Sequence, residues 1–147
     1  MATRQSRERR NEVLVRRFVE EIVTEQHYDR IPEFFADDYV RHDPQVPGEA
    51  RGPERFEEAL RTFHRGFPDE TIVIDDLFGR GDRVCLRYTA RATHTGEFAG
   101  LEPTGRPVEL TAIAVHRVED GRVAETWVEY DSLGLFRQLG AGPSTGE

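Results

Sequence analysis

"RVCLRYTARATHTGEFAGLEPTGRPVELTAIAVHRV", residues 83–118, decides the fold because it places two strand-like runs on either side of a turn-forming segment. Residues 83–93 and 108–118 are rich in β-branched and aromatic side chains, whereas the segment between them contains three Gly and two Pro. β-Branched and aromatic residues fit a pleated sheet, and Gly and Pro favour turns. The pattern predicts two antiparallel strands separated by a long connection.

The same pattern extends outward in both directions. Residues 71–78, "TIVIDDLF", and residues 122–130, "RVAETWVEY", are again strand-like, and the short segments "GRGD" and "EDG" separate them from the central pair. Such segments form tight turns between antiparallel strands. The second half of the chain is therefore predicted to be a meander of four strands.

The first half has a helical period instead. Apolar residues recur at spacings of three and four over residues 11–23 and again over residues 53–67, where Pro53 opens the segment. Residues 28–40 carry a shorter apolar face behind Asp29, a plausible N-cap, and predict a second, short helix. Helices followed by a strand meander predict an α+β domain with a curved sheet wrapped around three N-terminal helices.

Length and composition set the class of protein. A chain of 147 residues is expected to form one domain over residues 1–147, with an ordered core at about 10–140. No apolar run approaches the roughly 20 residues that a membrane span needs, and the N-terminus lacks the apolar segment of a secretory signal. We therefore expect a cytoplasmic protein that has no membrane partner. The arginines of residues 4–10 are expected to lie on a frayed terminus.

Charge and cysteine content narrow the range of partners. The formal net charge of −8 argues against a general nucleic-acid binder, because phosphate neutralisation needs a basic face. The single cysteine, Cys85, excludes an intramolecular disulfide and a cysteine-rich zinc site. No H-E-x-x-H motif and no close His/Asp pairing with helical spacing is present, so no metal is predicted.

The last predicted strand carries candidate site residues. Strand alternation places Glu125, Trp127, Glu129 and Asp131 on one face. These acids can simply be solvated, but a Trp beside Asp131 is also typical of a partly apolar pocket with a polar floor. Burial raises the pKa of a carboxyl group, so an acid in such a pocket can serve as a general base.

Histidines are the other candidates. His42 precedes a turn, where it can be structural or can line the mouth of a sheet. His94 and His116 follow alternating apolar residues, so each can be a core histidine or a pocket residue. No glycine-rich phosphate loop and no G-x-S-x-G motif occurs, which leaves a serine nucleophile unsupported.

Two motifs carry a resemblance to a known family. They are T-H-T-G-x-F-x-G-x-x-P-T-G at residues 93–105 and E-x-W-x-x-x-D-x-x-G-L-x-x-Q-L-G at residues 125–140. Together with "YVRHDP" near the middle of the first half, they resemble the SnoaL-like polyketide cyclases, or ester cyclases, of the nuclear-transport-factor-2-like superfamily, over about residues 10–140. The resemblance implies a cone-shaped α+β barrel (NTF2-like, cystatin-like) around a deep apolar cavity, with the Gly/Pro connection near its rim.

The resemblance also implies a reaction. Asp131 would act as the acid/base of an intramolecular aldol ring closure in a small hydrophobic substrate, without a metal or organic cofactor, and His42 or His94 would polarise a carbonyl. One departure is that the assisting histidine of the family falls near Ala114 and His116 here. The residues predicted to contact substrate are Trp127, Phe18, Phe35, Tyr39, Phe63, Phe67, Tyr88, His116 and Glu129.

Three alternatives stay open. The protein could bind a hydrophobic molecule without transforming it, or hydrolyse an epoxide with Arg87 or Arg91, although we identify no Arg-x-Asp pair on one strand. Chemistry like that of ketosteroid isomerases would need a base near Asp43 and a tyrosine such as Tyr88 or Tyr28. In each case a homodimer or higher homo-oligomer is expected, formed through the outer face of the sheet.

Overall fold

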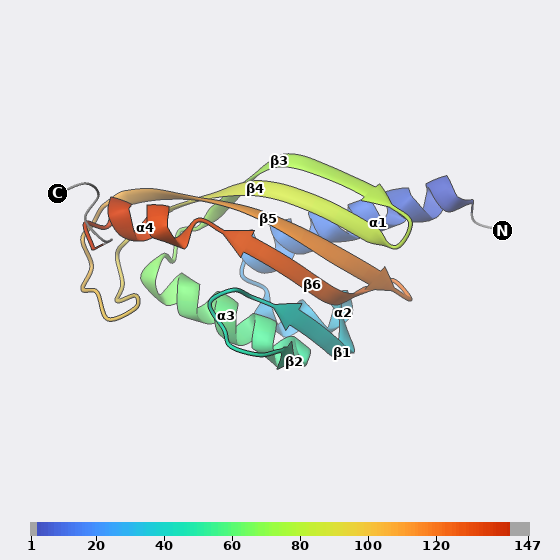
Figure 1. Ribbon diagram of the computed structural model, residues 1–147, viewed down its shortest axis with the longest axis horizontal. Coiled ribbons are helices and arrows are strands. Elements are labelled where there is room, and N and C mark those ends of the chain that lie inside the picture. Colours follow the sequence, from blue (N-terminus) through green and yellow to red (C-terminus); the bar gives the residue numbers. More distant parts are fainter. Residues whose placement is uncertain (1–2, 142–147) are drawn as a thin grey trace.

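A long N-terminal helix begins the computed structural model, which describes residues 3–141 (Figure 1). Helix α1 spans Arg4–Phe18 and continues as a π-helix, η1, over Val19–Thr24. The Thr3 hydroxyl accepts a hydrogen bond from the Ser6 amide and caps α1. The expectation of a frayed arginine-rich terminus is therefore wrong for residues 4–10, which form the first turns of this helix. No helix among the described residues is long and apolar enough to cross a membrane.

The predicted second helix is mostly a strand. Residues 28–30 form a 3-10 turn, η2 (Tyr28–Arg30), a single helical turn α2 follows over Ile31–Phe34, and strand β1 then runs over Phe35–His42. The helix prediction was wrong beyond Phe34. Tyr39 is fully buried while Asp37 and Asp38 are exposed, so the tyrosine reaches the core from a strand that adds an edge to the sheet.

The predicted third helix is confirmed as α3, Pro53–Gly66, after a short strand β2, Ala50–Arg51. Pro53 occupies the first turn, where its missing N–H costs nothing. Phe56 and Leu60 face the core one turn apart. Helix α3 thus lies across from the sheet, as Figure 1 shows.

The four predicted strands of the second half are all present. They are β3 Thr71–Arg80, β4 Arg83–Thr93, β5 Pro107–Glu119 and β6 Arg122–Tyr130, and a short helix α4, Ser132–Gln138, follows them. The sheet order is β2-β1-β6-β5-β4-β3, in which β1 runs parallel to β6 and the other neighbours are antiparallel. The α+β class and the curved mixed sheet are confirmed, but the sheet is open between β2 and β3 and does not close into a barrel.

The long β4–β5 connection is fixed against α3. The amides of Thr95 and Gly96 both donate to the Gly66 carbonyl at 3.1 Å. A Cβ atom at Gly96 would lie 1.8 Å from the Arg65 carbonyl oxygen, so only glycine permits this approach. Gly100 and Gly105 have positive φ angles, whereas Gly96 does not. The connection therefore has a defined position next to α3, and its Phe98 reaches the cavity described below.

Candidate active site

A cavity of about 690 Å³ lies between the inner face of the sheet and the helices. Its apolar wall comes from Phe18 of α1, from Phe56, Leu60 and Phe63 of α3, and from Leu86, Ala114 and Val128 of the sheet. A cavity of this size can hold a drug-sized ligand. The helices thus cover a hollow rather than a fully packed core.

Small residues on the middle strand leave room for this hollow. In the sheet register Ala112 of β5 pairs with Tyr88 on one side and Tyr130 on the other, while Ala114 pairs with Leu86 and Val128. Both tyrosines line the cavity. Burial raises the pKa of Tyr88 to about 12, so its hydroxyl remains a hydrogen-bond donor at neutral pH.

Asp43 supplies a carboxylate at the end of β1. Its side chain is only 7% exposed and lines the cavity. Oδ1 accepts a hydrogen bond from the Tyr130 hydroxyl at 2.8 Å and another from the Gln45 amide at 2.9 Å, while Arg41 Nη2 lies 3.4 Å from Oδ2. Burial first, and then the hydrogen bond to Asp43, raise the pKa of Tyr130. The phenol therefore holds the carboxylate without itself ionising.

Arg41 brings a buried positive charge to the same wall. It pairs with Thr126 in the parallel β1–β6 register, and its guanidinium lies 5.8 Å over the Phe56 ring. Burial acts to lower the pKa of Arg41, but the interactions with Tyr39 and Asp43 outweigh it and the net shift is upward. The cavity therefore contains a permanent cation paired with a carboxylate.

His116 contributes a neutral imidazole. Its Nδ1 is hydrogen-bonded to Thr126 Oγ1 at 2.8 Å, and its ring meets Phe18 edge-on at 5.1 Å. Burial, followed by the charge of Arg41, lowers the pKa of His116 to about 3. The ring is therefore uncharged at neutral pH and belongs to the apolar wall.

A second acid reaches the cavity from the α3–β3 link. Glu70 is 7% exposed and lines the cavity, and His64 Nε2 donates to its Oε1 at 2.8 Å. Among the described residues, no group of three or more His, Cys, Asp or Glu could hold a metal ion. The polar lining of the cavity thus includes the carboxyl groups of Asp43 and Glu70, the Arg41 guanidinium and the phenols of Tyr88 and Tyr130. The exposed side chains of Glu49, Arg55 and Glu58 also line it.

Asp131 does not face this cavity. Its side chain is exposed and caps helix α4, where Oδ1 accepts a hydrogen bond from the Gly134 amide at 2.9 Å. The inward orientation predicted for it is wrong, because the chain leaves the sheet after Tyr130 and turns into α4. Asp131 thereby satisfies a free amide at a helix start.

His42, Trp127 and Glu129 lie on the outer face of the sheet. The His42 and Trp127 rings stack at 5.3 Å, and His42 Nε2 is 2.7 Å from Glu125 Oε2. Glu129 is exposed. The predicted alternation of β6 holds from Glu125 to Tyr130, but the opposite face, with Thr126, Val128 and Tyr130, lines the cavity. The proposed pocket roles of these outer residues are therefore corrected.

His94 is a structural histidine. It is fully buried, stacks on Phe67 at 5.2 Å, and its Nδ1 accepts a hydrogen bond from the Thr104 amide, which fixes the ends of the β4–β5 connection. It is not on the cavity wall. Phe35, Tyr39 and Phe67 are likewise core residues, whereas Phe18, Phe63, Tyr88 and His116 line the cavity as predicted.

The predicted site residues did not include four polar residues that line the cavity, Arg41, Asp43, Glu70 and Tyr130, although the isomerase alternative considered a base near Asp43. A signal was present for the first two, because "RHD" at residues 41–43 is an Arg-x-Asp pair. Arg41 lies on β1, which ends at His42, and Asp43 follows the strand, so the two residues of this pair do not share one strand. Once residues 35–42 are read as a strand, this pair becomes visible.

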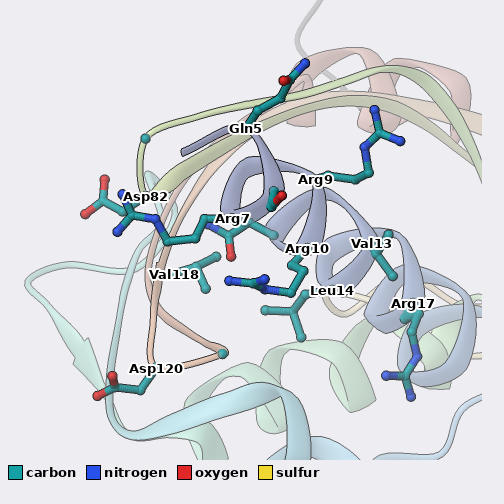
Figure 2. A pocket seen from close by; sticks show the side chains of 14 residues that line it. Gln5, Arg7, Arg9, Arg10, Val13, Leu14, Arg17, Asp82, Val118 and Asp120 are labelled. Carbon is teal, nitrogen blue, oxygen red and sulfur yellow. The ribbon is translucent and has the colours of Figure 1, made fainter. Parts of the chain in front are cut away.

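A second hollow lies at the far end of α1 (Figure 2). Arg7, Arg10, Leu14 and Val118 line it with Asp82 and other residues of the strand turns. Its walls are the exposed side of α1 and two tight turns, and its arginines are solvated. We therefore place the candidate active site in the cavity between the sheet and the helices.

Comparisons with known proteins show the family to which the chain belongs. The family model described as SnoaL-like polyketide cyclase matches residues 13–139. The aklanonic acid methyl ester cyclase of Streptomyces sp. (strain C5) is 31% identical over 135 residues, which cover 86% of this chain and 80% of that protein. The enzyme of the same name from Streptomyces peucetius is also 31% identical over 135 residues, which cover 86% of this chain and 88% of that protein.

Solved structures share the fold. Wild-type IdmH from Streptomyces antibioticus is 33% identical with a TM-score of 0.79, and the alignment covers 88% of this chain and 98% of that one. A SnoaL-like protein from Jannaschia sp. CCS1 reaches a TM-score of 0.86 at 22% identity, covering 97% and 100% of the two chains. The second likeness concerns the fold alone.

Proposed function

Because the chain belongs to the SnoaL-like polyketide cyclase family, we propose that it closes a ring in an apolar, enolisable small molecule by an intramolecular aldol reaction, without a cofactor. The observation that carries the proposal is the buried Asp43 carboxylate, which lines a 690 Å³ cavity and is held by Tyr130 and Arg41. The relatives named above act on aklanonic acid methyl ester, which makes a polyketide ester the natural class of substrate.

Asp43 is the base of this reaction. Its carboxylate takes a proton from an activated methylene of the substrate, and the resulting enolate carbon attacks a carbonyl carbon within the same molecule. The cavity holds the substrate folded so that these two carbons are close, an effect that can supply a large part of the rate enhancement.

The surrounding groups stabilise the charge that develops. Tyr88 and Arg41 line the same cavity and are both hydrogen-bond donors at neutral pH. Donors aimed at a developing oxyanion are worth more in a site from which water is excluded. The neutral His116 and the phenylalanines of the wall keep the surroundings apolar.

The test compares Asp43→Asn with Asp38→Asn, which alters an exposed aspartate of the same strand. Turnover of aklanonic acid methyl ester is followed by chromatography of the ring-closed product. Asp43→Asn should lower kcat by about 100-fold or more, the usual contribution of a general base, and the control should match wild type. Equal turnover by wild type and Asp43→Asn would show that another group is the base.

Epoxide hydrolysis is the second candidate, and the Arg41–Asp43 pair favours it. A carboxylate beside a guanidinium can activate water as well as remove a carbon-bound proton. Incubation with a limonene-sized epoxide separates the two, because only the hydrolase produces a diol. The unaltered recovery of both substrates, with measurable binding, would instead support a non-catalytic binder.

We also propose that the protein is a cytoplasmic homo-oligomer. The outer face of the sheet carries a row of apolar side chains in register, Trp127, Val115, Cys85 and Phe78, and Phe78 is 58% exposed. Pairing of two such faces in a homodimer would cover this row. Sedimentation of wild type and of Phe78→Asp tests the assembly, and a monomeric wild type would contradict it.

A further inference from the structure

Glu70 is a buried carboxyl group that the aldol step above does not use. It lies between α3 and β3, is 7% exposed and lines the cavity. Its Oε1 accepts a hydrogen bond from His64 Nε2 at 2.8 Å, while Oε2 has no hydrogen-bond partner within residues 3–141. One oxygen is therefore anchored and the other is available to a ligand in the cavity.

His64 links Glu70 to a second group. The imidazole is 6% exposed on the last turn of α3, and its Nδ1 is hydrogen-bonded to the Tyr28 hydroxyl. Tyr28 is partly exposed, does not line the cavity, and has the Arg61 guanidinium 4.1 Å from its ring centre. Tyr28, His64 and Glu70 thus form a continuous hydrogen-bonded chain that ends at the cavity wall.

The two carboxyl groups reach the same cavity from strands near opposite edges of the sheet. Asp43 follows β1 and Glu70 precedes β3, and strands β6, β5 and β4 lie between them in the sheet order. The charges of both acids act on Tyr88 of β4. Burial is the main cause of the raised pKa of Tyr88, and the charges of Glu70 and Asp43 raise it further. Both acids therefore line the same cavity, and Tyr88 lies on a strand between them.

We propose that Glu70 is the acid that protonates the acceptor oxygen in the ring closure, and that His64 is its positioning residue. This inference rests on the proposed function. Asp43 takes the proton from the methylene, the new C–C bond forms as the C=O π bond breaks, and the oxygen takes a proton from Glu70. Substrate and product are isomers, and the enzyme is reset when Asp43 releases its proton and Glu70 takes one up.

The environments of the two acids suit these opposite roles. Burial raises the pKa of Glu70, and the hydrogen bond and charge of His64 oppose that shift only in part. Asp43 instead has a guanidinium and two hydrogen-bond donors beside it. Pairs of carboxyl groups in contrasting surroundings are a general way to obtain one acid and one base in one site.

The experiment separates proton removal from ring closure. Aklanonic acid methyl ester is incubated in deuterated water with wild type, Asp43→Asn, Glu70→Gln and the exposed control Glu109→Gln. Glu70→Gln should still exchange the methylene proton for deuterium but close the ring about 100-fold or more slowly. Asp43→Asn should lose both steps. Ring closure by Glu70→Gln at the wild-type rate would overturn the inference and leave the role of Asp43 standing.

Absence of turnover of this ester would count against the proposed function alone. A measurement without substrate tests the role of Glu70 in that case. Carbon-13 NMR of the glutamate side-chain carboxyls should show Glu70 titrating above the ordinary pKa of a glutamate. His64→Asn should move that titration to still higher pH, which a merely space-filling His64 would not do. A Glu70 that titrates normally, or that is indifferent to His64→Asn, overturns the proposal.

Discussion

Asp131 provides the sharpest test of the site, because the family resemblance makes it the catalytic acid/base whereas the structure makes it a helix cap. Its Oδ1 accepts one hydrogen bond, from the Gly134 amide at 2.9 Å, at the start of a helix of seven residues. Loss of an N-cap side chain typically costs about 1 kcal/mol, and a negative charge at a helix start contributes about 0.3–1 kcal/mol.

Two substitutions of Asp131 separate the contribution of the hydrogen bond from that of the negative charge. Asp131→Ala removes both the bond and the charge and should lower the free energy of unfolding by about 1–2 kcal/mol. Asp131→Asn keeps a side-chain oxygen that can cap, so it should lose only the charge contribution of about 0.3–1 kcal/mol. For a domain of this size each kcal/mol lowers Tm by roughly 3–4 °C.

The assay measures both stability and turnover. Urea unfolding and thermal melts followed by circular dichroism should rank wild type above Asp131→Asn and Asp131→Ala last. Turnover of aklanonic acid methyl ester by either variant should stay within about twofold of wild type at a temperature where both are folded, since a cap outside the cavity adds nothing to a barrier. A fully folded Asp131→Asn that had lost turnover would refute this reasoning and restore Asp131 as the base.

Three further outcomes are expected. First, the imidazole of His116 stays neutral in the folded protein down to a pKa of about 3 but takes a proton near 6.5 once unfolded, so stability should fall by up to about 1.4 kcal/mol per pH unit as the pH drops below 6.5. His116→Gln should flatten this acid limb in urea titrations, and an unchanged limb would mean that the ring is charged when folded. Second, Tyr130→Phe removes the hydroxyl that donates to Asp43, and it should lower both kcat and, by about 1–3 kcal/mol, the free energy of unfolding; a fully active variant would show that this bond does not position the base. Third, Trp127→Ala should leave kcat unchanged in steady-state assays, because the indole stacks on the outer face, and a large loss would place that face in the site.

The sequence predicts much of the fold because its periodicities are local. The helix that Pro53 opens and the four strands of the second half follow from side-chain spacing and turn residues alone. The segment after Phe34 escaped this reasoning, since its pairing with β6 lies about 85 residues away along the chain and leaves no local signature. Its strand identity depends on tertiary contact, which overrides local preference.

The site was harder to predict because polar residues occur on both faces of β6. Trp127 between two acids resembles a pocket wall, but that face is the outer one, where Glu125 pairs with Arg117 and His42. A register irregularity near Val118 leaves both Val123 and Ala124 buried, so the inner face cannot be counted from the strand's first residue. The burial of Thr126 and Val128 is what identifies the inner face, and it is visible only once the helices are in place.

The parallel pairing of β1 with β6 has a consequence for how the protein is made. The Asp43–Tyr130 hydrogen bond joins positions 87 residues apart, so the base cannot be oriented until the chain as far as Tyr130 has left the ribosome. Until then Arg41 and its carboxylate partner face water, and the half-formed sheet lacks the strand that separates β1 from β5. Nascent or C-terminally shortened chains should therefore be unable to fold the hollow at all, and folding should be slowed by the late arrival of this distant contact.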